Sequence, residues 1–299
     1  MGHVSDGVKT PAIVNVVEPY DFALSLRAIR SFEPTATESE PRLRLAVRLG
    51  KKPSIIEVTL HDTQMLTAIS HPVSDPERVG GIVEWVLFTE LDLKPFYRLL
   101  SDKPNLAWLT KKLYGLKPYR PTSLFEMAVT AITEQQISLA AAYKIRKRVV
   151  ERFGEPVEDL WVFPEPEALA KASLDDLRAC GLSRQKSDYI KALAEKIAGG
   201  ELNLEGLKNI DTDKARGTIL NIKGFGRWSA DYILIRGLAR PDCVPVDDLG
   251  IRTVIGKLLG KGARPSAEEA EAMLKPYKPY RGLMAFYFLA AWRLKINPD

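Results

Sequence analysis

Two kinds of hydrophobic spacing divide this chain. Between residues 42 and 60, apolar residues alternate with polar ones, first in RLRLAVRL and again in IEVTL after the turn at GKKPS. A period of two is typical of strands with one buried face. From about residue 91 the apolar positions recur every three or four residues, which is typical of helices packed on a core. We therefore predict an α+β fold, with an antiparallel sheet and a few helices over residues 1–92 and an all-α region over residues 93–299.

Capping signals place the helices of the second region. Ser123 and Glu126 form an S-x-x-E pattern that opens one helix, and Ser138 is expected to cap the next, which ends at Gly154. A second S-x-x-E pattern begins at Ser266. Further helices are expected at about 166–179 (restarting at Ser173), 184–198, 211–221, 227–239, 248–259, 266–275 and 280–293, with short loops between them.

The composition is that of a globular protein without a membrane span. The chain has 299 residues, of which 45% are hydrophobic and 27% charged. No run approaches the ~18 apolar residues that a spanning helix needs, and the N-terminus lacks the layout of a secretion signal. We therefore expect a cytoplasmic protein that does not bind membranes. The net charge of +5 is a mild indication of a polyanionic partner.

The scarcity of cysteine and histidine excludes several kinds of site. Two cysteines, Cys180 and Cys243, are too few for a disulfide framework or a cysteine-ligated cluster. The three histidines, His3, His61 and His71, all lie in the first quarter of the chain. The helical region therefore has neither a histidine zinc site nor a Ser-His-Asp triad. Its chemistry must come from acids, lysines or aromatic side chains.

The segment IKGFGRW is a candidate phosphate clamp. Gly224 and Gly226 leave backbone N–H groups uncovered, and the following helix begins at about Arg227. A helix N-terminus carries partial positive charge and suits an anion, and Lys223 and Arg227 flank it with positive side chains that could contact DNA. The alternative is an ordinary helix-helix connection in which the glycines only permit the turn.

A longer stretch favours the phosphate clamp. LNIKGFGRWSADYILIRGL followed by VPVDDLGIR resembles the helix-hairpin-helix, Gly/Pro-rich loop and catalytic-aspartate signature of base-excision DNA glycosylases. FEMAVTAITEQQIS is similar to the helix that carries the minor-groove plug in the 3-methyladenine DNA glycosylase II branch. The resemblance covers residues 113–293 and implies two helical subdomains with a cleft between them. It matches the N-terminal sheet more loosely.

The resemblance also implies a monovalent cation at the hairpin. Family members hold Na⁺ or K⁺ with backbone carbonyls and a DNA phosphate. By position these carbonyls belong to Leu220, Ile222 and Phe225. Phe225, Gly224 and Gly226 would contact DNA at the same turn. We expect no other cofactor.

Two adjacent acids, Asp247 and Asp248, follow the PDCVPV loop. An acid at this point can cap the next helix. Breaking a nucleoside C1′–N bond builds positive charge on the sugar, which a fixed carboxylate stabilises while it orients or deprotonates water. The branch's motif assigns this role to Asp248. Related branches with a single acid after VPV would assign it to Asp247.

Trp228 follows the hairpin where bifunctional members of the superfamily carry a lysine nucleophile. Tryptophan cannot form a Schiff base, so the resemblance implies a monofunctional enzyme that uses water. An electron-rich indole attracts a cationic, N-alkylated purine flipped from the duplex. Tyr232, one helical turn later, would line the same pocket. The alternative is that Trp228 is a core aromatic.

Flipping a base leaves a gap that a side chain must fill. By position Gln136 is the candidate plug, with Gln135 beside it, although branch members often use an apolar residue here. The alternative is that both glutamines are polar residues at a helix break. Nearby basic side chains are candidate phosphate contacts: Lys111, Lys112, Lys117, Arg120, Lys144, Arg146, Lys147, Arg148 and Lys186.

These observations predict a DNA glycosylase that excises alkylated purines such as 3-methyladenine from damaged double-stranded DNA. It would act as a monomer, in the nucleoid if the source is prokaryotic. Two alternatives remain open at this point. One is a glycosylase for oxidised or deaminated purines, such as 8-oxoguanine or hypoxanthine. The other is a non-catalytic helix-hairpin-helix DNA-binding protein, although binding alone does not require a carboxylate pair.

Overall fold

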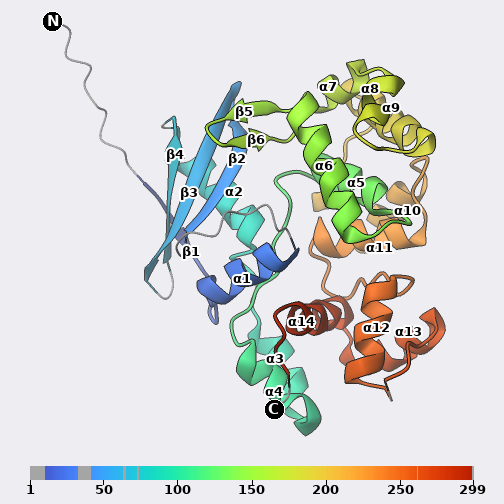
Figure 1. The fold of residues 1–299 in the computed structure, drawn as a ribbon. Helices are drawn as coiled ribbons and strands as arrows, with labels where there is room; N and C mark the ends of the chain where they lie inside the picture. Colours follow the sequence, from blue (N-terminus) through green and yellow to red (C-terminus); the bar gives the residue numbers. More distant parts are fainter. Residues whose placement is uncertain (1–10, 33–41, 63–64, 73, 261, 298–299) are drawn as a thin grey trace, which may run out of the picture.

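The computed structural model describes residues 11–32, 42–62, 65–72, 74–260 and 262–297 (Figure 1). Residues 1–10, which contain His3 and the stretch compared with secretion signals, lie outside these ranges. A four-stranded antiparallel sheet begins the fold, with strand order β1-β4-β3-β2. Its strands are β1 (Ala12–Asn15), β2 (Arg42–Leu49), β3 (Lys52–Asp62) and β4 (Met65–His71).

The predicted hairpin is confirmed as β2 and β3. Leu43 pairs with Val58 and Leu45 with Ile56, so the alternating apolar residues share a register. The turn is tighter than GKKPS suggested, because Leu49 already pairs with Lys52. Two helices accompany the sheet: α1 (Phe22–Phe32) and α2 (Pro76–Leu87).

The region beyond residue 91 is helical, as predicted. It begins with α3 (Lys94–Ser101) and α4 (Ala107–Lys112), for which no bounds were predicted. The helices expected from Ser123 onward are present and lie close to their predicted positions: α5 (Leu124–Glu134), α6 (Leu139–Phe153), α7 (Pro166–Lys171), α8 (Leu174–Ala179), α9 (Arg184–Ala198), α10 (Thr212–Leu220), α11 (Arg227–Arg236), α12 (Leu249–Leu258), α13 (Ala267–Leu274) and α14 (Arg281–Arg293). The α+β class is confirmed. A short hairpin of β5 (Glu155–Val157) and β6 (Leu160–Val162) interrupts the helices and was not predicted.

The capping predictions differ in one detail. Ser266 and Glu269 form the complete capping box at the start of α13. At α5, the Ser123 hydroxyl accepts from the Glu126 N–H at 3.0 Å, but the Glu126 carboxylate accepts from the N–H of Thr122 instead of Ser123. The helix start is therefore stabilised by two neighbouring residues, in a variant of the expected box.

Two arginines of β2 form ion pairs with a distant segment of the chain. Arg44 Nη1 lies 2.7 Å from Asp159 Oδ1, and Arg48 Nη2 lies 2.5 Å from Glu155 Oε1. Both acids belong to the β5–β6 hairpin segment, which contacts β2 and β3. The arginines therefore connect the sheet to the helical region, a contact between segments too far apart in sequence for the pattern to show.

The described residues form two hydrophobic cores. One joins the sheet and α1 to α3, α4 and the C-terminal helices α12–α14, and the other is built from α5 and α6 through α11. Figure 1 shows this division, with α5–α11 on one side and α12–α14 returning beneath them toward α1. The first core contains residues from both sides of the predicted boundary between residues 92 and 93.

Within the described ranges, no helix combines the length and apolar character needed to cross a membrane.

Candidate active site

A cleft of about 1110 Å³ lies where the two helical groups face each other. The acids and aromatics that the sequence predicted line it together, namely Trp228, Tyr232, Asp247 and Asp248. The two glutamines and the two hairpin glycines line it as well. Residues separated by more than a hundred positions in sequence therefore converge on one cavity.

The hairpin turn depends on Gly224. Its φ of +94° lies in the left-handed region, and a Cβ there would lie 2.4 Å from the ring of Tyr189. Gly226 is the N-cap of α11 and offers no side chain to cap the first N–H groups of the helix. These N–H groups point from a positive helix end, the arrangement that suits an anion.

The flanking residues of the hairpin have different surroundings. Lys223 is exposed, and Leu220 is 44% exposed, whereas Ile222 and Phe225 are buried. Arg227 was expected to contact DNA, but its Nη2 lies 2.9 Å from Glu271 Oε2. The Arg227 side chain therefore already has a protein partner.

The two glutamines have separate roles in the structure. Gln135 Nε2 donates to the Gly224 carbonyl at 2.9 Å and to the Ser229 hydroxyl at 3.0 Å, so it fastens α5 to the hairpin. Gln136 is exposed and has φ +56°, two residues after the last residue of α5. Of the two predicted plug residues, Gln136 is therefore the one whose side chain faces solvent at the cleft.

Asp248 is both the cap of α12 and a wall of the cleft. Its Oδ1 accepts from the Ile251 N–H at 2.9 Å, and its Oδ2 accepts from Trp228 Nε1 at 3.2 Å. The capping and catalytic interpretations are therefore compatible, because each oxygen has its own donor. The carboxylate is held at a fixed place, half-buried at the cleft wall.

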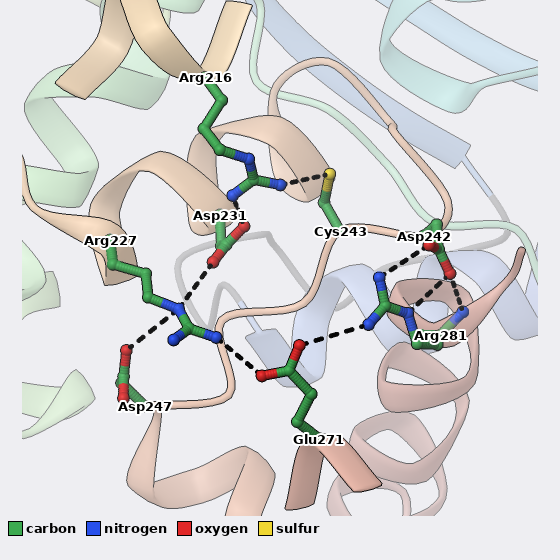
Figure 2. A network of polar contacts seen from close by, with 8 residues as sticks. All are labelled: Arg216, Arg227, Asp231, Asp242, Cys243, Asp247, Glu271 and Arg281. Atoms are coloured by element: carbon green, nitrogen blue, oxygen red, sulfur yellow. Dashed lines mark hydrogen bonds and ion pairs between the residues drawn. The ribbon is translucent and has the colours of Figure 1, made fainter. Parts of the chain in front are cut away.

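Asp247 also lines the cleft, but its carboxylate faces Arg227. Its side chain is 44% exposed, and its Oδ2 lies 4.0 Å from Arg227 Nε. Figure 2 shows Arg227 between Asp247 and Glu271, which comes from α13. Asp247 thus belongs to a surface ion-pair network that ties the loop before α12 to neighbouring helices.

The other end of the loop is anchored to α14. Arg281 Nη2 donates to Asp242 Oδ2 at 2.7 Å, and Arg281 Nε donates to Asp242 Oδ1 at 2.9 Å (Figure 2). Burial alone would raise the pKa of Asp242, but the hydrogen bonds and charge of Arg281 outweigh it and lower this pKa. The loop that carries Asp248 is therefore fixed at both ends.

A second pair supports the loop from α10 and α11. Arg216 donates to Asp231 and, at 3.3 Å, to the sulfur of Cys243 (Figure 2). Burial raises the pKa of Asp231, although Arg216 opposes the rise, and burial raises the pKa of Cys243 to about 11. Cys243 is therefore a thiol that packs within the loop.

The predicted aromatic pair is a stack. The rings of Trp228 and Tyr232 have centroids 4.9 Å apart and planes inclined by 26°. The Tyr232 hydroxyl donates to Glu134 Oε2 at 2.8 Å. Burial and the nearby Glu134 charge raise the pKa of Tyr232 well above its ordinary value, so it is a neutral donor. Trp228 therefore lies in the cleft wall, not in a separate core.

Three basic residues proposed as phosphate contacts are engaged inside the protein. Lys117 is 1% exposed and donates to the carbonyls of Val17 and Thr89, each at 2.7 Å, and burial lowers its pKa to about 8. Arg120 is also buried and pairs with Glu90. The side chains of both residues are engaged inside the protein, so the phosphate interpretation was wrong for both.

Lys186 is the third. Its Nζ donates to the carbonyls of Thr133 and Gln135 at 2.8 and 2.7 Å, and burial lowers its pKa. It is also the one lysine that lines the cleft in the described part of the chain. Its amine is thus occupied in holding the end of α5.

Comparison with known proteins places this geometry in a family. The family model described as "HhH-GPD superfamily base excision DNA repair protein" matches residues 129–279. The chain is 32% identical over 259 residues to a DNA-3-methyladenine glycosylase of Bacillus subtilis, covering 83% of this chain and 84% of the relative. The chain belongs to the DNA-3-methyladenine glycosylase branch of the HhH-GPD superfamily.

Solved structures of this branch share the fold. A 3-methyladenine DNA glycosylase from Archaeoglobus fulgidus superposes with a TM-score of 0.83 at 26% identity, covering 95% of this chain and 99% of that one. Schizosaccharomyces pombe 3-methyladenine DNA glycosylase, solved in complex with abasic DNA, has a TM-score of 0.59 at 27% identity and covers 69% and 98%. The first match includes the N-terminal sheet as well as the helices.

Two residues that line the cleft were not identified as site residues from the sequence. Glu134 lines it from the end of α5, and Phe286 lines it from α14. Phe286 belongs to the core as well as to the cleft wall, because it is only 7% exposed. Glu134 carried one signal, an acid directly before the Gln-Gln pair, but nothing local linked it to Tyr232.

Proposed function

We propose that this DNA glycosylase is monofunctional, and that it excises alkylated purines of the 3-methyladenine type from duplex DNA by base flipping and hydrolysis. The observation that carries the proposal is the contact between Asp248 and Trp228, which sets a fixed carboxylate beside an aromatic wall in one cleft. A flipped nucleotide with its base against the wall would bring its sugar to the carboxylate.

Asp248 is the catalytic residue in this proposal. Departure of the base leaves positive charge on the deoxyribose, and a preorganised carboxylate stabilises that charge without further rearrangement. The Asp248 carboxylate also accepts the proton of the attacking water as the C1′–O bond forms. Asp247, which faces Arg227, is a positioning residue.

Trp228 and Tyr232 supply the base pocket. A cationic alkylated purine is attracted to an indole face, and it is already a good leaving group. The cleft offers no available lysine for Schiff-base chemistry among its described residues, since Lys186 is held by two carbonyls. Water is therefore the nucleophile, and the product is an abasic site.

The hairpin and Gln136 hold the DNA. The uncapped N–H groups after Gly226 would bind a phosphate, with Lys223 nearby, and Gln136 would fill the gap left by the flipped base. The carbonyl oxygens of Leu220, Ile222 and Phe225 would hold Na⁺ or K⁺ against the same phosphate. Ile222 already accepts the Phe225 N–H at 3.1 Å, and its oxygen keeps a second lone pair for a cation.

The proposal is tested by base release from defined duplexes. We expect single-turnover release of 3-methyladenine from methylated DNA, with one protein chain per duplex. We also expect no covalent complex trapped by borohydride. Release of 8-oxoguanine or hypoxanthine instead would change the substrate class. Salt-sensitive binding without release of any base would show a binding protein, and a trapped complex would show a lyase.

A further inference from the structure

A third carboxylate in the cleft has no role in the hydrolysis. In the described structure, the acids that line the cavity are Asp247, Asp248 and Glu134. The Glu134 side chain is 11% exposed. Its Oε2 accepts the Tyr232 hydroxyl at 2.8 Å, and its Oε1 lies 3.6 Å from Arg146 Nη1.

Burying a carboxylate in this place costs stability. Removing an ion from water costs several kcal/mol, which contacts such as those with Tyr232 and Arg146 must offset. A neutral side chain could equally end α5, and Tyr232 could donate to a neutral oxygen. The negative charge of Glu134 therefore indicates a role in the cleft.

The position of Glu134 relative to Asp248 is informative. Asp248 contacts Trp228, Trp228 stacks on Tyr232, and Tyr232 contacts Glu134. Each ring of the stacked pair thus contacts one carboxylate. Phe286 of α14 lines the same cavity.

A purine held along this wall has two ends of different chemistry. Its glycosidic nitrogen must lie toward Asp248, because the sugar is attached there. Its six-membered ring then extends toward Glu134. A carboxylate accepts hydrogen bonds and repels oxygen acceptors, so it favours an exocyclic amino group at that edge and disfavours a carbonyl oxygen.

We infer that Glu134 is a specificity-determining residue that accepts a hydrogen bond from the 6-amino group of a flipped adenine-type base. It selects alkylated adenine over alkylated guanine and hypoxanthine, which carry an oxygen at the same position. The inference rests on the proposed function and assigns the substrate edge that the pocket recognises.

The test uses DNA methylated with dimethyl sulfate, which contains 3-methyladenine and 7-methylguanine in the same duplex. Both bases are cationic as nucleosides, so the ratio of their release rates reports recognition of the group at the 6-position and not attraction of the positive charge. Glu134→Gln replaces the carboxylate with an amide that can also donate to an oxygen. We expect the ratio of 3-methyladenine to 7-methylguanine release to fall at least about tenfold. An unchanged ratio, with both rates lowered equally, would overturn the inference.

Tyr232→Phe separates recognition from positioning. This variant removes the hydroxyl that donates to Glu134 and leaves the charged carboxylate in place. The release ratio should stay at or above the wild-type value. If Tyr232→Phe lowers the ratio as much as Glu134→Gln does, then Glu134 acts by holding Tyr232 and the inference is wrong.

A measurement on the wild-type protein requires no variant. Free adenine and free hypoxanthine differ at the 6-position, and we expect adenine to inhibit base release at a severalfold lower concentration. Equal inhibition would contradict the inference. Failure of the wild-type protein to release any methylated base would instead refute the proposed function, so the two failures are distinguishable.

Discussion

Two helix-turn-helix units in this protein have nearly the same turn and different uses. Gly181, between α8 and α9, has φ +98°, and Gly224, between α10 and α11, has φ +94°. After the first turn, the Ser183 hydroxyl accepts from the N–H of Lys186 at 3.2 Å. After the second, Gly226 provides no side-chain cap. The first helix start is satisfied by its own chain, and the second is left for a ligand.

The first unit, whose helix start is capped by Ser183, supports the second unit, whose helix start is left open by Gly226; they are called the capped and the open unit below. Lys186 of α9 holds the carbonyls at the end of α5, and the ring of Tyr189 lies against Gly224. Gln185 donates to the Tyr189 hydroxyl at 2.7 Å and steadies that ring. A single capping position thus decides whether a helix N-terminus serves the fold or an anion.

Among changes to the two units, the largest loss of DNA affinity is expected at the turn of the open unit. Gly224→Ala would place a methyl group against Tyr189 and force alanine into the left-handed region. We expect a stability loss of about 1–3 kcal/mol and at least about tenfold weaker DNA binding. The matched control is Gly200→Ala, which has φ +75° but no heavy atom within 4 Å of the new methyl group. Denaturant unfolding and DNA titration of both variants measure the difference, and equal DNA affinities would break the comparison.

A smaller effect is expected when the open unit receives a cap. Gly226→Ser adds a hydroxyl where a Cβ meets nothing within 4 Å, so the fold should gain a few tenths of a kcal/mol. The hydroxyl would compete with phosphate for the same N–H groups and weaken DNA binding by about threefold to tenfold. Gly226→Ala adds the carbon without the acceptor and should bind more tightly than the serine variant. Unchanged affinity in Gly226→Ser would show that these N–H groups do not face DNA.

The smallest effect on DNA is expected at the capped unit. Ser183→Ala removes the cap of α9 and should lower the free energy of unfolding by about 1 kcal/mol. DNA affinity should stay within about twofold, because the α9 N–H groups serve the fold. Thermal unfolding and the same DNA titration test both statements. A large loss of affinity without a loss of stability would assign phosphate binding to the first unit as well.

Local sequence patterns predicted the helices and the site residues along the chain. Contacts between segments that are distant in sequence could be identified only in the structure. The spacing from the hairpin to Asp248 places that acid at a helix start, and it is the cap of α12. The burial of Lys117 and the pairing of Arg44 with Asp159 depend on how sheet and helices meet, which no short window of sequence contains. Glu134 lies 98 positions from Tyr232, so its place in the pocket was equally hidden.

The central claim is that the carboxylate of Asp248, and not that of Asp247, stabilises the charge that develops on the sugar. Asparagine is a good helix cap, so Asp248→Asn should keep α12 and DNA binding intact. The decisive measurement is the single-turnover rate of 3-methyladenine release for Asp248→Asn and Asp247→Asn. The account predicts a loss of about 10²–10³-fold or more for Asp248→Asn and a rate within about tenfold of wild type for Asp247→Asn. A near-normal rate in Asp248→Asn, with the loss in Asp247→Asn, would contradict it.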